Sequence, residues 1–247
     1  MQPQTVVVLP GDKLPLSPSS SQSALTLGPG IYCNPQTHEI IPTQAGIAHI
    51  THPKPHRTQL YVDYDSKRYI PCVGDLVIGC IVGTQGGDSY RVSLSNFSND
   101  VSLPYMAFPN ASKKNRPTLV KGDLVYAKVA SAEKELEATL ECLDPGFGIL
   151  EDGMVLDCPL RFARMLLFEG DDKQKKEGTS SLLRLLARHT KFEIAIGING
   201  KIWIKCDTVS DTLACYRIVL ECCKSPVSQY DSIVKRHFKE VAKVVEE

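Results

Sequence analysis

The chain has 247 residues, and its 43% hydrophobic and 23% charged content is ordinary for a globular protein, which excludes wholesale disorder and a fibrous repeat. This length allows two or three domains of about 100 to 150 residues each. Lys plus Arg and Asp plus Glu number 28 each, so no overall positive field attracts nucleic acid, and any basic surface has to be local.

The cysteines and the first residues bear on the cellular compartment. The chain has nine cysteines without a dense framework, and Cys222 and Cys223 are adjacent, which favours a reducing compartment. The apolar run Val6 to Leu9 is too short for the core of a signal peptide, and no stretch approaches the roughly 20 apolar residues that span a bilayer. We therefore expect a protein of the cytosol, the nucleus or both, with no membrane partner.

Residues 1–58 form the first predicted domain, a small β domain. Its short apolar runs are interrupted by Pro10-Gly11, by Gly28-Pro29-Gly30 and by the Ser-rich linker from Ser17 to Ser23. Strands this short and this interrupted are too weak to hold together alone in water. We therefore expect this domain to dock against a larger neighbour.

Residues 59–143 form the second predicted domain, an all-β barrel. Short runs rich in Val, Ile and Tyr alternate with turn residues, and Gly86-Gly87 is a hairpin turn signal between two runs. The sequence Gly-Asp-Leu-Val occurs at Gly74 and again at Gly122, where Gly-Asp tightens a turn that feeds an apolar strand. The spacing predicts a five-stranded barrel of the OB type, with strands at Leu60–Tyr64, Leu76–Val82, Tyr90–Leu94, Val101–Leu103 and Leu124–Ala130.

Residues 144–247 form the third predicted domain, which is α+β. Its elements are predicted from local signals. A proline marks the start of one helix, a leucine-rich face marks an amphipathic helix, and apolar alternation on both sides of an Asn-Gly turn marks two strands. They are a helix from Pro159 to Phe168, a helix over Ser180–His189, strands over Phe192–Ile198 and Ile202–Ile204, a helix capped by Asp207, Thr208 or Ser210 and ending near Cys223, and a helix over Ser228–Val244.

The turn between these two strands reads Gly197-Ile198-Asn199-Gly200, a G-x-N-G motif. In KH domains a G-x-x-G loop admits a nucleic-acid backbone because glycine has no side chain to block it. A hairpin turn that uses Asn-Gly needs no ligand, so the motif alone leaves both interpretations open. Trp203 follows on the second strand, and we expect it to be buried where this sheet meets another domain or subunit.

The predicted barrel, the G-x-N-G motif and the sequence Trp-Ile-Lys follow one another along the chain. With this order the chain resembles exosome cap subunits of the Rrp-forty type, which join an N-terminal domain, an S-one-type OB barrel and a KH domain. The similarity covers nearly the whole chain apart from the Ser-rich linker and the loop over 170–180. The matching stretches are Leu27–Tyr32, Asp65–Pro71, Gly74–Gly79, Ser102–Phe108, Asn115–Pro117 and Gly197–Trp203.

The resemblance implies a subunit without a catalytic centre, cofactor or metal, working in the nucleus, including the nucleolus, and in the cytoplasm. Its partners would be RNase-PH-like ring subunits, other cap subunits, exosome nucleases and single-stranded RNA, but not DNA. It would bridge the ring and guide RNA inward for 3'-to-5' processing and degradation. The resemblance also implies that Gly197, Ile198, Asn199 and Gly200 are mainly structural, with direct RNA contact as the alternative.

The loop after the fourth predicted strand is the best candidate for RNA contact. It places Lys113, Lys114 and Arg116 close together, and OB barrels follow the phosphates of single strands with such cations. Just upstream, Tyr105 and Phe108 are expected either to stack on bases or to belong to the barrel core. A second, weaker patch is Lys67 and Arg68, which also suits a strand edge or a protein contact.

Three other hypotheses are less well supported by the sequence. His49, His52 and His56 have metal-like spacing, but Pro53 and Pro55 prevent a regular helix from presenting them together. The pairs Asp63/Asp65 and Asp171/Asp172 could hold the metals of a nuclease, yet acidic loops are far commoner than metal pairs. A freestanding OB/KH adaptor in translation or ribosome assembly is the alternative function, and co-purification with ring subunits would separate it from a cap subunit.

Overall fold

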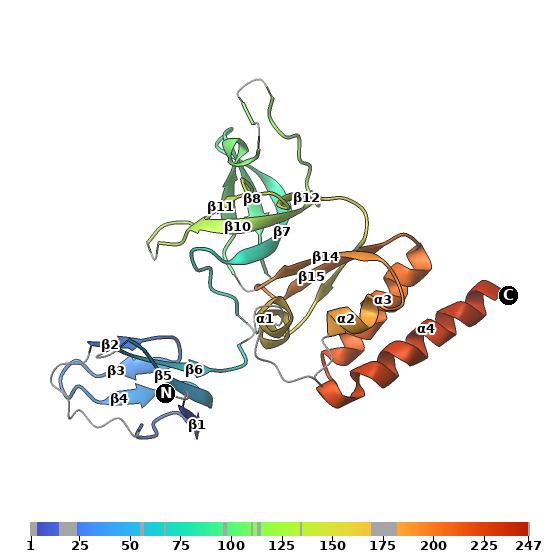
Figure 1. Ribbon diagram of the computed structural model, residues 1–247. Coiled ribbons are helices and arrows are strands. Elements are labelled where there is room, and N and C mark those ends of the chain that lie inside the picture. Colours follow the sequence, from blue (N-terminus) through green and yellow to red (C-terminus); the bar gives the residue numbers. More distant parts are fainter. Residues whose placement is uncertain are drawn as a thin grey trace. The chain divides into compact units, whose positions relative to one another are not determined.

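The computed structural model describes residues 4–14, 24–54, 57–66, 68–95, 98–109, 111–112, 115–133, 135–168 and 182–246. The chain folds into two compact units, Met1–Asp65 and Ser66–Glu247. The first unit is a small β domain, and the second joins a β barrel to an α+β domain (Figure 1).

The first unit is built on a four-stranded sheet in the order β1-β5-β6-β2, with a separate pair, β3 and β4. Its buried apolar core is small and includes Val8, Ala48 and Val62, whereas Val7 and Leu9 are 78% and 60% exposed. Apolar side chains therefore remain on its surface. The strands are β1 (Gln4–Val8), β2 (Ala24–Leu27), β3 (Ile31–Cys33), β4 (Ile40–Pro42), β5 (Gly46–Lys54) and β6 (Arg57–Asp63).

The prediction that Leu60–Tyr64 starts the barrel is wrong. Leu60 and Val62 lie on β6, which pairs antiparallel with β5 and parallel with β2 in the first unit. Apolar alternation identifies a strand, but it does not identify the sheet that the strand joins.

The barrel of the second unit has five strands and closes on itself. Neighbours pair in the order β7-β8-β9-β11-β10, and β10 pairs back to β7, while β12 extends the sheet beside β10. The fifth barrel strand is thus β11, which was not predicted from the sequence because it has only three residues. The strands are β7 (Leu76–Gln85), β8 (Ser89–Ser93), β9 (Val101–Pro104), β10 (Leu124–Ser131), β11 (Thr139–Glu141) and β12 (Gly148–Leu150).

The two Gly-Asp turns start β7 and β10 with the same geometry. Gly74 and Gly122 have φ of 90° and 103°, which favours glycine. The carboxylate of Asp75 accepts a hydrogen bond from the backbone N–H of Cys72 at 3.1 Å, and the carboxylate of Asp123 accepts one from Val120 at 2.8 Å. The prediction that these pairs form strand-feeding turns is confirmed.

The α+β domain has a three-stranded antiparallel sheet in the order β13-β15-β14, and its helices pack on one face (Figure 1). The core between sheet and helices includes Leu156, Leu186, Ile202 and Ile218. The elements are β13 (Met154–Asp157), α1 (Leu160–Phe168), α2 (Leu182–Leu186), β14 (Phe192–Gly197), β15 (Lys201–Cys206), α3 (Val209–Cys222), a 3-10 turn η2 (Val227–Gln229) and α4 (Tyr230–Glu246).

Local signals located most of this domain. Thr208 is the N-cap of α3, and its hydroxyl accepts a hydrogen bond from the backbone N–H of Asp211, as expected of one of the three candidate caps. The helix from Pro159, both strands and the Asn-Gly turn are confirmed. Within the part of the chain that the structure describes, no helix is long and apolar enough to cross a membrane.

Candidate functional site

The connection between β9 and β10 lies at the end of the barrel away from the α+β domain (Figure 1). It begins with a 3-10 turn, η1 (Tyr105–Ala107), and continues through Phe108. The ring of Phe108 is buried in the barrel core, so it offers no open face for stacking. Tyr105 is only half-buried, and its ring meets that of Tyr90 edge to face at 4.5 Å between centroids.

Arg116 rests on this aromatic pair. Its guanidinium carbon lies 5.5 Å from the centroid of the Tyr105 ring, a cation–π arrangement. One guanidinium nitrogen, Nη1, donates a hydrogen bond to the backbone carbonyl of Gly87 at 3.5 Å. Arg116 remains exposed, so its charge is placed at the surface and held there. Lys113 and Lys114 lie outside the described residues.

Among the described residues of the loop, Ser112 and Asn115 are hydrogen-bonded to each other at a turn. The backbone N–H of Asn115 donates to the hydroxyl of Ser112 at 3.0 Å, and the backbone N–H of Ser112 donates to the carbonyl of Asn115 at 3.0 Å. This turn immediately precedes Arg116. The loop therefore presents a cation beside an aromatic ring, which is the chemistry that binds phosphates and bases.

The second predicted patch lies elsewhere. Lys67 is outside the described residues. Arg68 is exposed in the segment that leads into the barrel, and its backbone N–H donates a hydrogen bond to the hydroxyl of Ser66 at 3.2 Å. Arg68 precedes Tyr69, whose carbonyl accepts a hydrogen bond from the Ser98 hydroxyl. Arg116 contacts Gly87 and Tyr105 instead, so the two arginines have different neighbours.

The G-x-N-G turn is packed against the barrel. Asn199 is 5% exposed, and its amide nitrogen donates to the carbonyls of Ile78 at 2.8 Å and Leu94 at 2.7 Å. Its amide oxygen accepts from the N–H of Ile78 at 3.2 Å. The backbone N–H of Ile198 also donates to Leu76 at 2.7 Å. The turn therefore joins the α+β domain to strands of the barrel through hydrogen bonds.

Both glycines of this turn are needed for close packing. A Cβ on Gly197 would lie 2.8 Å from the backbone nitrogen of Ile78, and one on Gly200 would lie 2.5 Å from the carbonyl oxygen of Cys158. Gly200 also has a φ of 80°. Here glycine allows protein backbone to approach, and both residues are buried.

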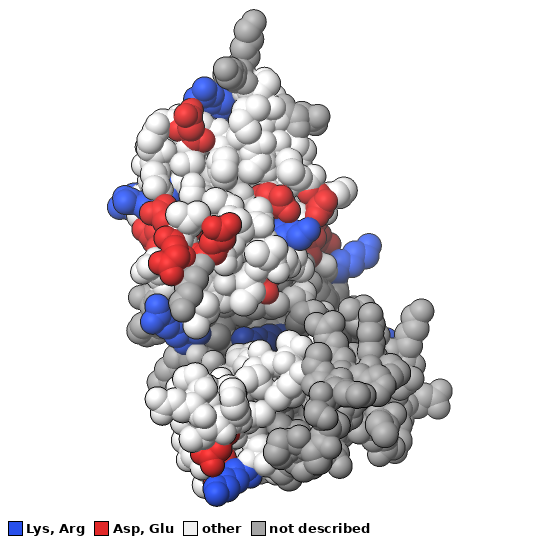
Figure 2. Space-filling view, turned by 90° about the vertical axis from the view of Figure 1, so that its left-hand side faces the viewer, with Lys and Arg blue, Asp and Glu red and all other residues white. Residues whose placement is uncertain are grey.

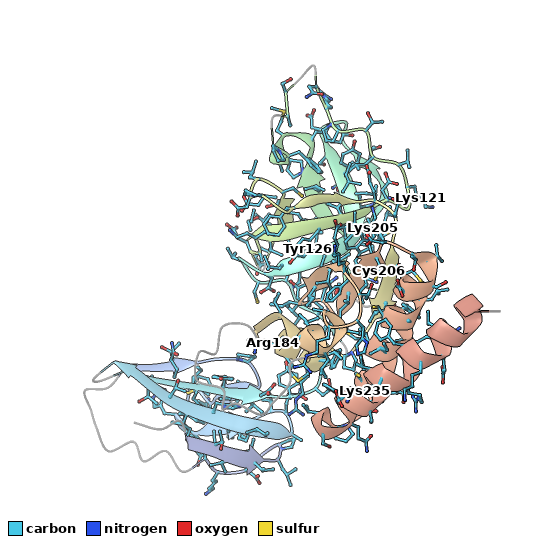
Figure 3. All side chains as sticks on the ribbon, turned by 45° about the vertical axis from the view of Figure 1, so that its right-hand side comes forward. Lys121, Tyr126, Arg184, Lys205, Cys206 and Lys235 are labelled. Carbon is cyan, nitrogen blue, oxygen red and sulfur yellow. The ribbon has the colours of Figure 1, made fainter. Side chains whose placement is uncertain are left out.

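Trp203 is buried beside Ile78 of the barrel and Ala195 of β14, which confirms its expected place where the sheet meets another domain. Its indole N–H donates to the carbonyl of Asp152 at 2.8 Å. A hollow of about 360 Å³ lies next to it, and Tyr126 from the barrel and Lys205 from β15 both line it (Figure 3). The hydroxyl of Tyr126 donates to Ile196 at 3.3 Å, and burial raises its pKa.

Several charged side chains on the described surface of the barrel form ion pairs. Figure 2 shows acidic and basic side chains side by side on the face of the barrel that it presents. Lys128 pairs with Glu141 at 3.8 Å and with Asp144 at 3.6 Å, and Arg91 pairs with Asp100 at 3.6 Å. Arg116 lies over an aromatic ring and is exposed, so its guanidinium is accessible to a phosphate.

The metal hypotheses rest partly on residues that the structure does not describe, His56 among them. The ring of His49 stacks on Tyr61 at 4.9 Å between centroids. Asp63 lies at the end of β6, while Asp171 and Asp172 fall outside the described residues. Over the ranges that the structure describes, no group of three or more His, Cys, Asp or Glu side chains could hold a metal ion.

Three family models match consecutive parts of the chain. Residues 25–68 match the model described as Exosome complex exonuclease Rrp40 N-terminal domain, and residues 69–153 match Exosome complex component RRP40, S1 domain. Residues 153–210 match a KH domain. A solved structure described as an exosome complex RNA-binding protein has a TM-score of 0.56 and 21% identity, covering 71% of this chain and 98% of that one, which supports the fold.

Relatives extend the similarity over the full length. Exosome complex component RRP40 of Saccharomyces cerevisiae is 56% identical over 248 residues, covering 97% of this chain and 98% of the relative. The Drosophila melanogaster protein of the same name is 34% identical, with 94% and 96% covered, and the Homo sapiens one is 34% identical, with 68% and 59% covered. The chain therefore belongs to the family of exosome complex component RRP40, with its N-terminal, S1 and KH domains.

Proposed function

We propose that this chain is a non-catalytic cap subunit of the RNA exosome, which binds single-stranded RNA and guides it toward a separate nuclease for 3'-to-5' processing and degradation. The observation that carries the proposal is the 56% identity to the yeast exosome component over 97% of the chain. A freestanding OB/KH adaptor is not favoured, because the similarity includes the N-terminal domain as well as the barrel and the KH domain.

RNA contact is proposed at the loop between β9 and β10. Arg116, Lys113 and Lys114 bind successive phosphates of the RNA, and the Tyr105 ring packs against the Arg116 guanidinium. Phe108 is not included, because it belongs to the barrel core. Lys67 and Arg68 are at most an auxiliary patch.

The chemistry of this loop suits binding rather than catalysis. Guanidinium and ammonium groups donate hydrogen bonds and stay protonated at neutral pH, so they cannot take a proton from an attacking water. An aromatic ring adds a stacking face but no base. We therefore assign no catalytic residue to this loop.

The first unit is proposed to dock on RNase-PH-like ring subunits, with other cap subunits and the associated nucleases nearby. Val7 and Leu9 are largely exposed on and beside β1, an edge strand of a sheet with a small core. Apolar side chains on an open strand edge suit a protein partner. The nucleus, with the nucleolus, and the cytoplasm are the proposed locations.

The test is the native mass of the assembly that contains the tagged chain in cell extract. We expect a complex that includes RNase-PH-like subunits, and we expect the double variant Val7→Asp/Leu9→Asp to lose them. A matched control is Val73→Asp, which changes a 68% exposed valine outside the first unit and should leave the complex intact. A monodisperse monomer from the unaltered chain would support the freestanding adaptor instead.

A further inference from the structure

One buried side chain fastens the β9–β10 connection to the barrel. Tyr90 lies on β8 and is 5% exposed. Its hydroxyl accepts a hydrogen bond from the backbone N–H of Leu119 at 3.1 Å and donates one to the carbonyl of Pro117. A phenol has one hydrogen to donate, so its donor and an acceptor site are both occupied by the end of the loop that follows Arg116.

We propose that Tyr90 is the positioning residue of the RNA-binding loop: it holds Arg116 where a phosphate can reach it, without contacting RNA itself. This inference rests on the proposed RNA contact of the loop. It assigns to Tyr90 a role that the sequence did not suggest, because a tyrosine on an apolar strand usually contributes to the core.

Arg116 is held from two directions. Its main chain continues into Pro117, whose carbonyl is bound by the Tyr90 hydroxyl, and proline further restricts the backbone at that point. Its side chain lies over Tyr105, and the Tyr105 ring in turn packs against the ring of Tyr90. The same tyrosine therefore fixes both the backbone and the aromatic support of the arginine.

Such fixation affects binding through entropy. An arginine side chain has many rotamers, and freezing them on contact with a ligand costs free energy, which a pre-ordered side chain has largely lost already. Removing the anchor should therefore weaken RNA binding even though no RNA contact is removed. The expected loss is roughly three- to tenfold in Kd, the scale of one or two immobilised side chains.

Tyr90→Phe isolates this role, because it keeps the ring in the core and removes only the hydroxyl. Tyr69→Phe is the matched control. Tyr69 is 2% exposed, and its hydroxyl donates to the carboxylate of Asp75 at 2.7 Å, in the Gly-Asp turn that starts β7. Each variant removes only the hydroxyl of a buried tyrosine, with two hydrogen bonds lost at Tyr90 and one at Tyr69, and only Tyr90 is bonded to the loop.

The experiment measures binding of a fluorescent single-stranded oligouridine to the full chain, at about 50 mM salt where phosphate contacts are strong. The variants are Tyr90→Phe, Arg116→Ala, their combination and Tyr69→Phe. We expect Tyr90→Phe to raise Kd roughly three- to tenfold in the unaltered chain and less than about twofold when Arg116 is already alanine. Tyr69→Phe should change Kd by less than about twofold. Hydrogen exchange at the Leu119 amide should quicken in Tyr90→Phe.

The outcomes separate the two proposals. If Arg116→Ala weakens binding but Tyr90→Phe does not, or if Tyr90→Phe weakens binding equally in both backgrounds, the positioning role is overturned while the RNA contact stands. Unchanged exchange at the Leu119 amide also overturns it. If the unaltered chain shows no binding, or Arg116→Ala has no effect, the RNA contact of the loop is refuted and the positioning role with it.

Discussion

Two connections of the second unit carry the most suggestive sequence motifs, and their surroundings are opposite. The G-x-N-G turn between β14 and β15 is buried, and every polar atom of the Asn199 side chain is bonded to barrel backbone. In the connection between β9 and β10, Arg116 is exposed and its guanidinium lies over the Tyr105 ring. The first turn therefore joins domains, and the second is available to a ligand.

This comparison shows that a motif acquires its role from where its polar groups find partners. Glycine permits the approach of any backbone, whether of RNA or of the protein's own barrel. At Gly200 the neighbour is the carbonyl of Cys158, whereas at Gly87, in the turn between β7 and β8, there is open space. Burial and satisfied hydrogen bonds identify the structural turn, and exposure identifies the candidate interface.

The largest expected effect is that of Asn199→Ala on stability. The substitution leaves the N–H and carbonyl of Ile78 and the carbonyl of Leu94 without their bonds in a buried place. We expect a loss of about 2 to 4 kcal/mol in the free energy of unfolding, measured by urea denaturation. Asn34→Ala is the control, because the Asn34 side-chain oxygen accepts a hydrogen bond from the backbone N–H of Gln36 at 2.9 Å in an exposed turn. This substitution should cost under about 1 kcal/mol. Equal losses would contradict the account of the buried turn.

Gly200→Ala and Gly87→Ala compare the two environments directly. Their φ angles are 80° and 82°, so the backbone penalty of about 1 to 2 kcal/mol is shared. Only at Gly200 does the new Cβ meet backbone, at 2.5 Å from the carbonyl of Cys158. We expect Gly200→Ala to be more destabilising by about 1 to 2 kcal/mol in the same measurement. A larger loss at Gly87 would reverse our assignment of the packed turn.

The loop cations should affect RNA binding and not stability. Replacing Lys113, Lys114 and Arg116 with alanine should weaken binding of any single-stranded RNA about tenfold or more and flatten its salt dependence, by about 0.7 in the log–log slope for each phosphate that the loop no longer binds. Binding titrations at several salt concentrations measure both quantities. An unchanged slope would remove the loop from the RNA interface.

The smallest effect is expected at the exposed carboxylate of Glu221 on α3. Its bond with Arg236 at 2.6 Å, and then its contact with His237 at 2.8 Å, lower its pKa from the ordinary value of 4.5. Because the folded pKa is the lower one, the unfolded chain takes up the proton first as pH falls, and the stabilisation present above pH 4.5 is lost. The Tm difference between the unaltered chain and Glu221→Gln should be small at pH 7 and disappear at lower pH. A difference that grows as pH falls below 4.5 would contradict this.

Local chemistry made much of the fold predictable. The Gly-Asp turns, the Thr208 cap and the Asn-Gly hairpin each depend on residues within a few positions, so composition and spacing were sufficient to locate them. β6 was recognised as a strand but assigned to the wrong sheet, because its partners are determined by tertiary packing.

The site was less predictable, because its contacts join distant residues. The Asn199 side chain bonds backbone groups 121 and 105 positions away, and the Tyr90 hydroxyl bonds residues 27 and 29 positions away. Backbone partners leave no signature in the sequence, since every residue type has a carbonyl. Phe108 shows the same limit. Its position beside the loop suggested that it stacks on bases, but its ring is buried in the barrel core.

The central claim is that RNA contacts the open connection and not the buried turn. Ultraviolet crosslinking of single-stranded RNA to the assembled complex, followed by identification of the crosslinked peptides of this chain, tests it most directly. We predict crosslinks within residues 105–119 and none at Gly197 to Gly200. Crosslinks at the G-x-N-G turn, with none in the β9–β10 connection, would contradict the account.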